Sequence, residues 1–183
     1  RIENWRVFHR GAGVTGALIL DDTTAYNSST GLFTADSTST VFKVGTDFSV
    51  NGGYPYVAYC FADIQGFSKF GSYLGDGDAD GTFVYTGFKP AMVILKRTDT
   101  TNNWLIYDHK RSGYNPKQDK LYPDDTSAED ASTTSVDLLS NGFKLRADSA
   151  SQNASDGTYI YMAWAEQPFV SSTNTNNIPT TAR

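Results

Sequence analysis

The chain repeats three apolar blocks of sequence in the same order, and this repetition constrains its fold more than any other feature. The members of the pairs are 99, 101 and 103 residues apart (Trp5 to Trp104, Phe42 to Phe143, Tyr56 to Tyr159). Loops of unequal length would produce such a drift, and within the blocks apolar residues match apolar residues. We therefore predict a duplicated β unit in which equivalent blocks form equivalent strands.

The repetition also predicts how the chain is divided. Residues 1–67 would be a partial first unit, 68–170 a complete second unit, and 171–183 a polar C-terminal tail. The second unit opens with a leader, Phe83–Arg97, that the first unit lacks. Because the chain opens almost directly on the Trp5 block, we expect Arg1 to be the edge of a fragment. Whether the two units form one domain or two stays open.

Most of the sequence has the composition of β-strands. Seven segments are rich in Val, Ile, Thr and aromatic residues and are bounded by Gly, Asn, Asp and Ser: Thr40–Val44, Tyr54–Ala62, Thr82–Tyr85, Ala91–Arg97, Trp104–Tyr107, Gly142–Arg146 and Thr158–Ala165. The segment Ser127–Leu139 is the best helix candidate but is rich in Ser and Thr. Short strands with turn-rich links predict an all-β fold, an antiparallel β-sandwich or jelly roll.

Two of these segments are uncharged on both faces. In Tyr159–Ala165 aromatic and aliphatic residues alternate, and its counterpart Tyr56–Ala62 is likewise built of aromatic and small or aliphatic residues. A strand without charge on either face is typical of an inner strand that is covered on both sides. We therefore expect both segments to be central, and Cys60 to be a small core residue.

Composition excludes several classes of protein. The net charge of the 183 residues is −5 with both signs interspersed, which argues against a nucleic-acid partner. No apolar run has the length of a membrane span, so we expect no membrane insertion. Cys60 is the single cysteine, which excludes a disulfide framework, and two histidines are too few for the usual zinc cluster.

Four stretches carry a resemblance to a known family: Gly87–Arg97, Asn103–Asp108, Asp137–Leu145 and Gly157–Glu166. This pattern resembles a repeat domain of unknown function in virion proteins of tailed bacteriophages, above all tail-fibre-like proteins of marine phages, often beside concanavalin A-like modules. The resemblance covers about Gly75–Phe169, and Trp5–Phe67 as a partial unit.

The resemblance implies a β-rich module of the virion, in the tail or another surface structure, that serves host attachment or fibre architecture. Its partners would be other virion subunits, in the homotrimers common among phage fibres, and a host-surface glycan. It implies no catalytic residues. Two alternatives remain: a purely structural virion module that binds no receptor, and a secreted bacterial β-sandwich that binds or cleaves glycans.

The residues themselves also favour a non-enzymatic role. Asp63 and Glu166 occupy equivalent positions in the two units, each directly after a predicted strand. Their repetition indicates a structural role, such as pairing with a backbone amide or a cation, rather than an acid and base with separated pKa values. His9 and His109 are not equivalent, and Glu129 and Asp130 have no evident partner.

An acidic loop is the one candidate for a metal site. Asp76, Asp78 and Asp80 alternate with small residues, as at the start of a calcium loop, although Gly87 stands where a bidentate Glu would be needed. A turn between strands is the commoner role for such a sequence. Calcium is therefore a candidate ligand at these three aspartates, and we predict no other cofactor.

Three tyrosines in loops are candidates for binding a glycan. Tyr26, Tyr114 and Tyr122 stand among polar residues, where an exposed ring can stack on a sugar while its hydroxyl forms a hydrogen bond. The alternative is ordinary surface tyrosine. Tyr114 and Tyr122 lie in Lys110–Ser135, the longest segment without a strand pattern, and such long loops are often functional.

Overall fold

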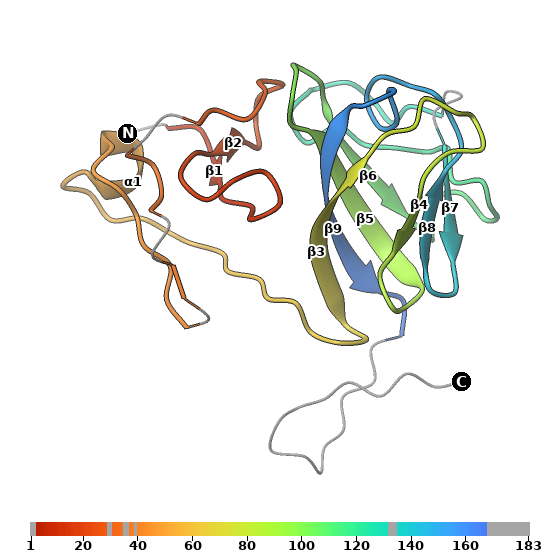
Figure 1. Cartoon of the computed structure of the whole chain (residues 1–183), viewed down its shortest axis with the longest axis horizontal. Helices are drawn as coiled ribbons and strands as arrows, with labels where there is room; N and C mark the ends of the chain where they lie inside the picture. The colour runs from red at the N-terminus through yellow and green to blue at the C-terminus, as the bar shows by residue number, and fades with distance from the viewer. Residues whose placement is uncertain (1–2, 29–30, 35–36, 39, 132–134, 168–183) are drawn as a thin grey trace, which may run out of the picture.

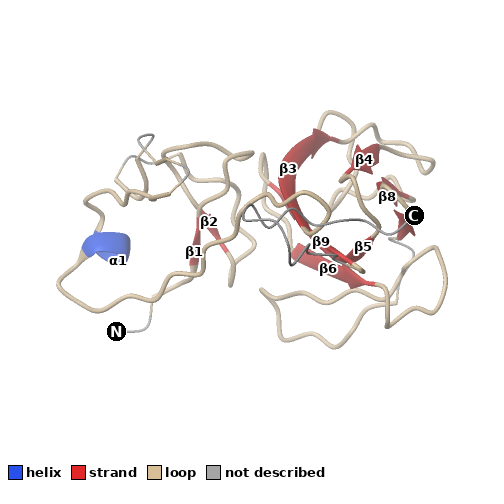
Figure 2. Ribbon diagram, turned by 90° about the horizontal axis from the view of Figure 1, so that it is seen from below, coloured by secondary structure: helices blue, strands red, loops and turns tan. Residues whose placement is uncertain are grey.

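The regular secondary structure of the chain is almost entirely antiparallel β-strand, as predicted (Figures 1 and 2). The structure, a computed structural model, describes residues 3–28, 31–34, 37–38, 40–131 and 135–167. The elements within these ranges are β1 (Arg6–Val7), β2 (Leu18–Ile19), α1 (Phe48–Asn51), β3 (Ser68–Leu74), β4 (Phe83–Tyr85), β5 (Pro90–Arg97), β6 (Trp104–Asp108), β7 (Val136–Leu139), β8 (Gly142–Leu145) and β9 (Thr158–Ala165). The predicted tail, 171–183, lies outside the described residues.

Two sheets share one apolar core. The first has the strand order β3-β9-β5-β6 and the second the order β4-β8-β7. Buried side chains from all seven strands meet in a single cluster: Tyr73, Val84, Val93, Leu95, Leu105, Tyr107, Val136, Leu138, Phe143, Leu145, Tyr159, Tyr161 and Ala163, together with Phe88. The rings of Tyr73 and Tyr159 stack within it, 5.0 Å apart at 10°. This core holds the two sheets together.

Strand β9 is covered on both faces, which confirms the prediction for Tyr159–Ala165. On one face its residues enter the shared core, and on the other Ile160 and Met162 pack with Trp104 of β6 and Leu18 of β2. Trp104 is fully buried, and its Nε1 donates a hydrogen bond of 2.7 Å to the carbonyl of Ile19. The N-terminal part of the chain therefore packs on the outer face of the four-stranded sheet.

A buried lysine also anchors the N-terminal part. Lys96 of β5 has no exposed surface, and its Nζ donates to the carbonyls of Thr23, at 2.7 Å, and Asn102. Desolvation by burial lowers the pKa of Lys96 to about 8. Backbone bonds from Tyr26 to Thr98 and from Asn102 to Thr23 close the same junction.

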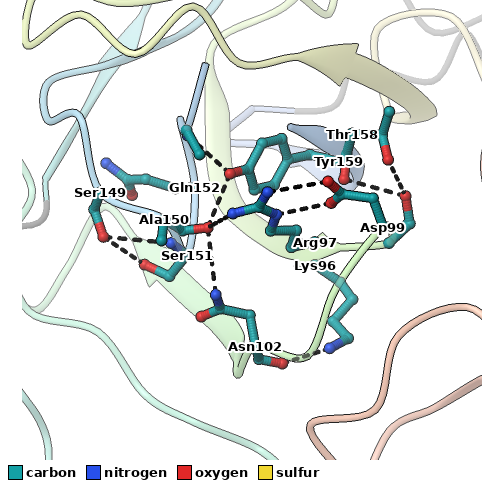
Figure 3. Close-up of polar contacts among 12 residues, drawn as sticks. Lys96, Arg97, Asp99, Asn102, Ser149, Ala150, Ser151, Gln152, Thr158 and Tyr159 are labelled. Carbon is teal, nitrogen blue, oxygen red and sulfur yellow. Dashed lines mark hydrogen bonds and ion pairs between the residues drawn. The ribbon is translucent and has the colours of Figure 1, made fainter. Parts of the chain in front are cut away.

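A polar network closes the end of the sheet near Arg97 (Figure 3). Arg97 binds both carboxylate oxygens of Asp99, at 2.7 and 3.0 Å, and donates to the carbonyl of Ala150 at 3.1 Å. The same carbonyl accepts from the hydroxyl of Tyr159 at 2.9 Å. Just beyond, the buried Gln152 accepts from the hydroxyl of Tyr107 at 2.9 Å. The polar groups of this network form hydrogen bonds with one another, so we assign the network a structural role.

The prediction that Tyr54–Ala62 is an inner strand is wrong. This segment forms no strand, and Val57, Tyr59 and Phe61 are 71%, 71% and 63% exposed. Cys60 is likewise exposed rather than buried. The edge position beside β9 is taken by Ser68–Leu74 instead. That segment carries Lys, Gly and Ser, a composition that edge strands tolerate and that hides them from a search for apolar runs.

The other repeated blocks also lie in different environments. Trp5 is 51% exposed while Trp104 is fully buried, and Phe42 is 48% exposed while Phe143 is fully buried. Thr40–Val44 contributes an isolated bridge from Val44 to Phe33 rather than a strand. The structure therefore does not confirm two equivalent units. The helix candidate Ser127–Leu139 ends in a strand instead, because its residues Val136–Leu139 form β7.

The contrast between Cys60 and its sequence counterpart Ala163 gives a stability prediction. Ala163 lies fully buried in the shared core, so Ala163→Asp should lower the free energy of unfolding by about 4 kcal/mol or more, because it buries an unpaired charge. Cys60→Asp should change it by less than about 0.5 kcal/mol. Urea unfolding at submicromolar protein concentration measures both. Equal losses would contradict the strand assignment.

Lys96 makes stability depend on pH in a defined window. The folded pKa is about 8 and the ordinary value is 10.5, so between these values the unfolded chain holds a proton that the folded chain has released. Stability therefore rises with pH in this window. Relative to Lys96→Met, the wild type should gain up to about 2 kcal/mol between pH 8 and pH 10, since one pKa unit is worth about 1.4 kcal/mol. Parallel stability curves for the two proteins would refute this.

Candidate ligand pocket

A pocket lies where three strand ends of the four-stranded sheet meet. β5 runs antiparallel to β6 and β9. Lys89, just before β5, therefore lies at the same end of the sheet as His109 and Glu166, which follow β6 and β9. The cavity has a volume of about 260 Å³. Its lining residues are Lys89, His109, Gly113, Tyr114, Asn115, Lys117, Leu138 and Glu166.

Glu166 is the charged centre of the pocket wall. Its carboxylate pairs with Lys89 Nζ at 2.7 Å, and its backbone N–H donates to the Lys89 carbonyl at 2.9 Å. The hydrogen bond from Lys89 is the main cause that lowers the pKa of Glu166. The carboxylate is therefore ionised at neutral pH and acts as an acceptor for hydrogen bonds rather than as a proton donor.

His109 faces the same carboxylate. Its Nδ1 lies 3.1 Å from the carbonyl of Ala91, which can only accept, so Nδ1 carries the proton. Its Nε2 lies 4.0 Å from Glu166 Oε1 and faces the pocket. With the Lys89 ammonium group and the Glu166 carboxylate beside this ring, the wall offers both donor and acceptor groups to a ligand.

The loop that forms the rest of the wall is held by two polar side chains. Lys117 is buried, and its Nζ donates to the carbonyls of Ser112 and, at 3.3 Å, His109. Asn115, which precedes a cis peptide bond to Pro116, exchanges hydrogen bonds of 3.0 Å each with the N–H and C=O of Leu138. The Asn115 side chain thereby pairs with β7 as a neighbouring strand would.

Tyr114 is the predicted tyrosine that the structure brings to the pocket. It lies between Gly113 and Asn115 in the held loop and is 90% exposed. A fixed backbone under an exposed ring limits the conformational entropy that a ligand must remove on binding. The arrangement of an aromatic ring beside acceptor and donor groups suits a polyhydroxylated ligand.

The other two predicted tyrosines have internal partners. The hydroxyl of Tyr26 accepts from the N–H of Gly16 at 2.8 Å, and its ring packs beside Trp104 and Ile160. The hydroxyl of Tyr122 donates to Asp130 at 2.5 Å, and its ring packs on the shared core. Both are half-buried and neither lines the pocket, so the three tyrosines do not form one site.

The acidic loop has its own internal contacts. Asp76 accepts from Asp78 N–H at 3.0 Å and from the Asn153 side chain at 2.8 Å, in the manner of a turn. Asp80 pairs with Lys144, at 3.0 Å, and with Arg146. Within the described ranges, no group of three or more His, Cys, Asp or Glu side chains is placed to hold a metal ion. Calcium binding would have to displace two cations from Asp80, and it stays a prediction.

Other acidic residues have the structural roles that their positions predicted. Asp63 pairs with Lys69 at 2.5 Å and accepts from the N–H of Phe70 at 2.7 Å, and Glu166 pairs with Lys89. Glu129, for which the sequence offered no partner, binds Arg111 at 3.2 Å.

Sequence reasoning missed most of the pocket. Lys89, His109 and Lys117 carry no local motif, and their sequence separation is bridged only by the antiparallel pairing of β5, β6 and β9. The available signal was positional: each of Lys89, His109 and Glu166 stands within two residues of a predicted strand end. Predicting the strand order would have been needed to join them.

The fold and the pocket define an antiparallel β protein with a polar, tyrosine-rimmed site at its strand ends. The sequence model of one family matches residues 1–168. The chain therefore belongs to that family, which is described as a domain of unknown function, DUF7483. No curated protein and no solved structure matches the chain. No helix in the described part of the chain has the length and hydropathy needed to cross a membrane.

The different settings of Tyr122 and Tyr114 lead to a stability prediction. Tyr122→Phe removes a hydrogen bond to a carboxylate and should lower the free energy of unfolding by about 1–2 kcal/mol. Tyr114→Ala should leave it within about 0.5 kcal/mol, because the ring is 90% exposed. Differential scanning calorimetry of both variants checks this. A large loss for Tyr114→Ala would mean that its ring supports the loop.

Proposed function

We propose that this chain is a non-enzymatic β-sandwich module of a phage virion, a tail-fibre or adsorption component, whose Tyr114 pocket binds a host-surface glycan. The observation that carries the binding proposal is the position of Tyr114, 90% exposed at the rim of a polar pocket of about 260 Å³. The virion assignment rests on the sequence resemblance of Gly87–Glu166 and is independent of the pocket.

The wall chemistry supports a sugar rather than an apolar ligand. Glu166 offers carboxylate oxygens, Lys89 an ammonium group, and His109 an imidazole ring nitrogen. Sugar hydroxyls both donate and accept, so they can use all three groups while the Tyr114 ring covers a sugar face. A lectin-like site of this kind sits on loops at the end of sheets, where recognition is commonly carried.

The same wall supports binding without cleavage. A glycosidase of the usual kind needs two carboxyl groups across the scissile bond, about 5–9.5 Å apart. Glu166 is the one acidic residue among the described residues that line the pocket. Its pKa is lowered by Lys89, whereas a general acid needs a raised pKa.

Binding to an array of bacterial surface oligosaccharides tests the proposal. Tyr114→Ala should weaken binding about tenfold, the effect of losing one stacking ring. Gly113→Trp should weaken it by placing a bulky ring on a residue that lines the pocket, and the backbone there accepts a side chain because a Cβ at Gly113 meets no atom within 4 Å. The control Tyr85→Ala removes a ring that is 65% exposed on β4 and should bind as wild type.

The alternatives predict other results. A purely structural virion module would bind no oligosaccharide in any form, and a glycan-cleaving enzyme would release shortened sugars from the array. Immunogold labelling of purified virions from the source, with an antibody against the chain, tests the virion assignment separately. Absence of label from intact and disrupted particles would refute it.

A further inference from the structure

The segment Tyr54–Ala62 is a strand sequence without a strand partner. It runs extended from α1 to β3 and crosses the space between the N-terminal part and the sheets (Figure 1). Between Tyr54 and Phe61 the backbone forms no hydrogen bond to any other described residue. Its large side chains Tyr54, Tyr56, Val57, Tyr59 and Phe61 are 47% to 71% exposed. Apolar side chains and unpaired backbone groups together are the features of an open sheet edge.

We propose that Tyr56–Ala62 is a self-association strand, which pairs antiparallel with the same segment of a second copy of this chain. The first support is sequence: the block Tyr56–Asp63 matches Tyr159–Glu166, which forms the central strand β9 and pairs antiparallel with β3 and β5. The chain's own structure thus shows that such a block forms a well-paired inner strand when partners lie on both sides.

The charge of the segment favours a second copy over another kind of partner. No residue from Tyr54 to Ala62 is charged, so two copies meet without repulsion and a charged partner gains nothing. In a symmetric antiparallel pair, every apolar residue faces an apolar residue of the same segment. Such an isologous contact uses the same patch on both chains and closes at two copies.

The ends of the segment define how far pairing extends. Pro55 has no N–H to donate, so pairing begins after it. At the other end Asp63 already binds Lys69, at 2.5 Å, and the N–H of Phe70, at 2.7 Å. Contacts within the chain hold the segment's conformation, since Tyr59 lies 5.9 Å from the Trp5 ring and Phe61 lies 5.7 Å from the Trp164 ring. A pre-extended strand loses less entropy on pairing.

Light scattering after size exclusion tests the association with the whole chain. The wild type should elute with twice the chain mass of 20.0 kDa. Val57→Lys places a charge in the pair at a position 71% exposed in the single chain, so it should keep the fold and weaken association at least about tenfold. The control Tyr85→Lys, at a site 65% exposed on β4, should stay dimeric. A single-copy mass for wild type, a three-copy mass, or a dimer unaffected by Val57→Lys would overturn the proposal.

Hydrogen exchange distinguishes strand pairing from loose apolar contact. Amides in Tyr56–Ala62 should exchange at least about tenfold more slowly at concentrations where the dimer forms, and at alternate residues, as in a two-stranded ladder. The Val57→Lys chain should show fast exchange at every concentration. Fast exchange over this segment in a wild-type dimer would also overturn the proposal. Neither measurement depends on the Tyr114 pocket, so the glycan proposal stands or falls by itself.

Discussion

The structure depends on the burial of one strand on both of its faces. β9 hydrogen-bonds to β3 on one side and β5 on the other. Its residues Tyr159, Tyr161 and Ala163 enter the core shared by the two sheets, while Ile160 and Met162 face the N-terminal part of the chain. Its side chains thus join both the core between the two larger sheets and the cluster that holds Leu18 of β2. The absence of charge along β9 is the sequence counterpart of that position.

The pocket is a consequence of the same strand order. In an antiparallel sheet, one strand begins at the end of the sheet where its neighbours finish. The residues that follow β6 and β9 therefore lie beside the residue that precedes β5. A rigid sheet thus fixes the backbone of Glu166, His109 and Lys89. The loop above them is held by the Asn115 side chain and the buried Lys117. The Lys89 side chain at this site is 50% exposed and Tyr114 is 90% exposed, so the proposed binding would use side chains that folding does not need to bury.

Composition and alternation were sufficient to predict the all-β class and five of the strands, because β4, β5, β6, β8 and β9 are apolar runs bounded by turn residues. The strand prediction failed at Tyr54–Ala62. Local sequence indicates whether a segment can form a strand, but it does not indicate whether a partner strand lies beside it. Composition and alternation also missed β3, whose Lys69, Gly71 and Ser72 suit an edge. Lys96 shows the same limit, because lysine is rarely fully buried and only the carbonyls of Thr23 and Asn102 explain its burial.

The segments Tyr56–Asp63 and Tyr159–Glu166 are similar in sequence, yet only the second pairs as a strand among the described residues. Similar sequence gives a similar strand only where the surrounding fold provides hydrogen-bond partners and cover. The pair Asp63 and Glu166 illustrates the point, because both bind a lysine although one follows an exposed segment and the other a central strand.

The central position of β9 bears on how the protein is made. The strand that fills the middle of the four-stranded sheet is the last described strand in chain order. During translation β3 and β5 leave the ribosome with the gap between them unfilled, so the sheet cannot close until residue 165 has cleared the exit tunnel. Through most of synthesis the apolar faces of β5 and β6 are left without their final cover. Until then these faces are open to aggregation, and slower translation would prolong that exposure.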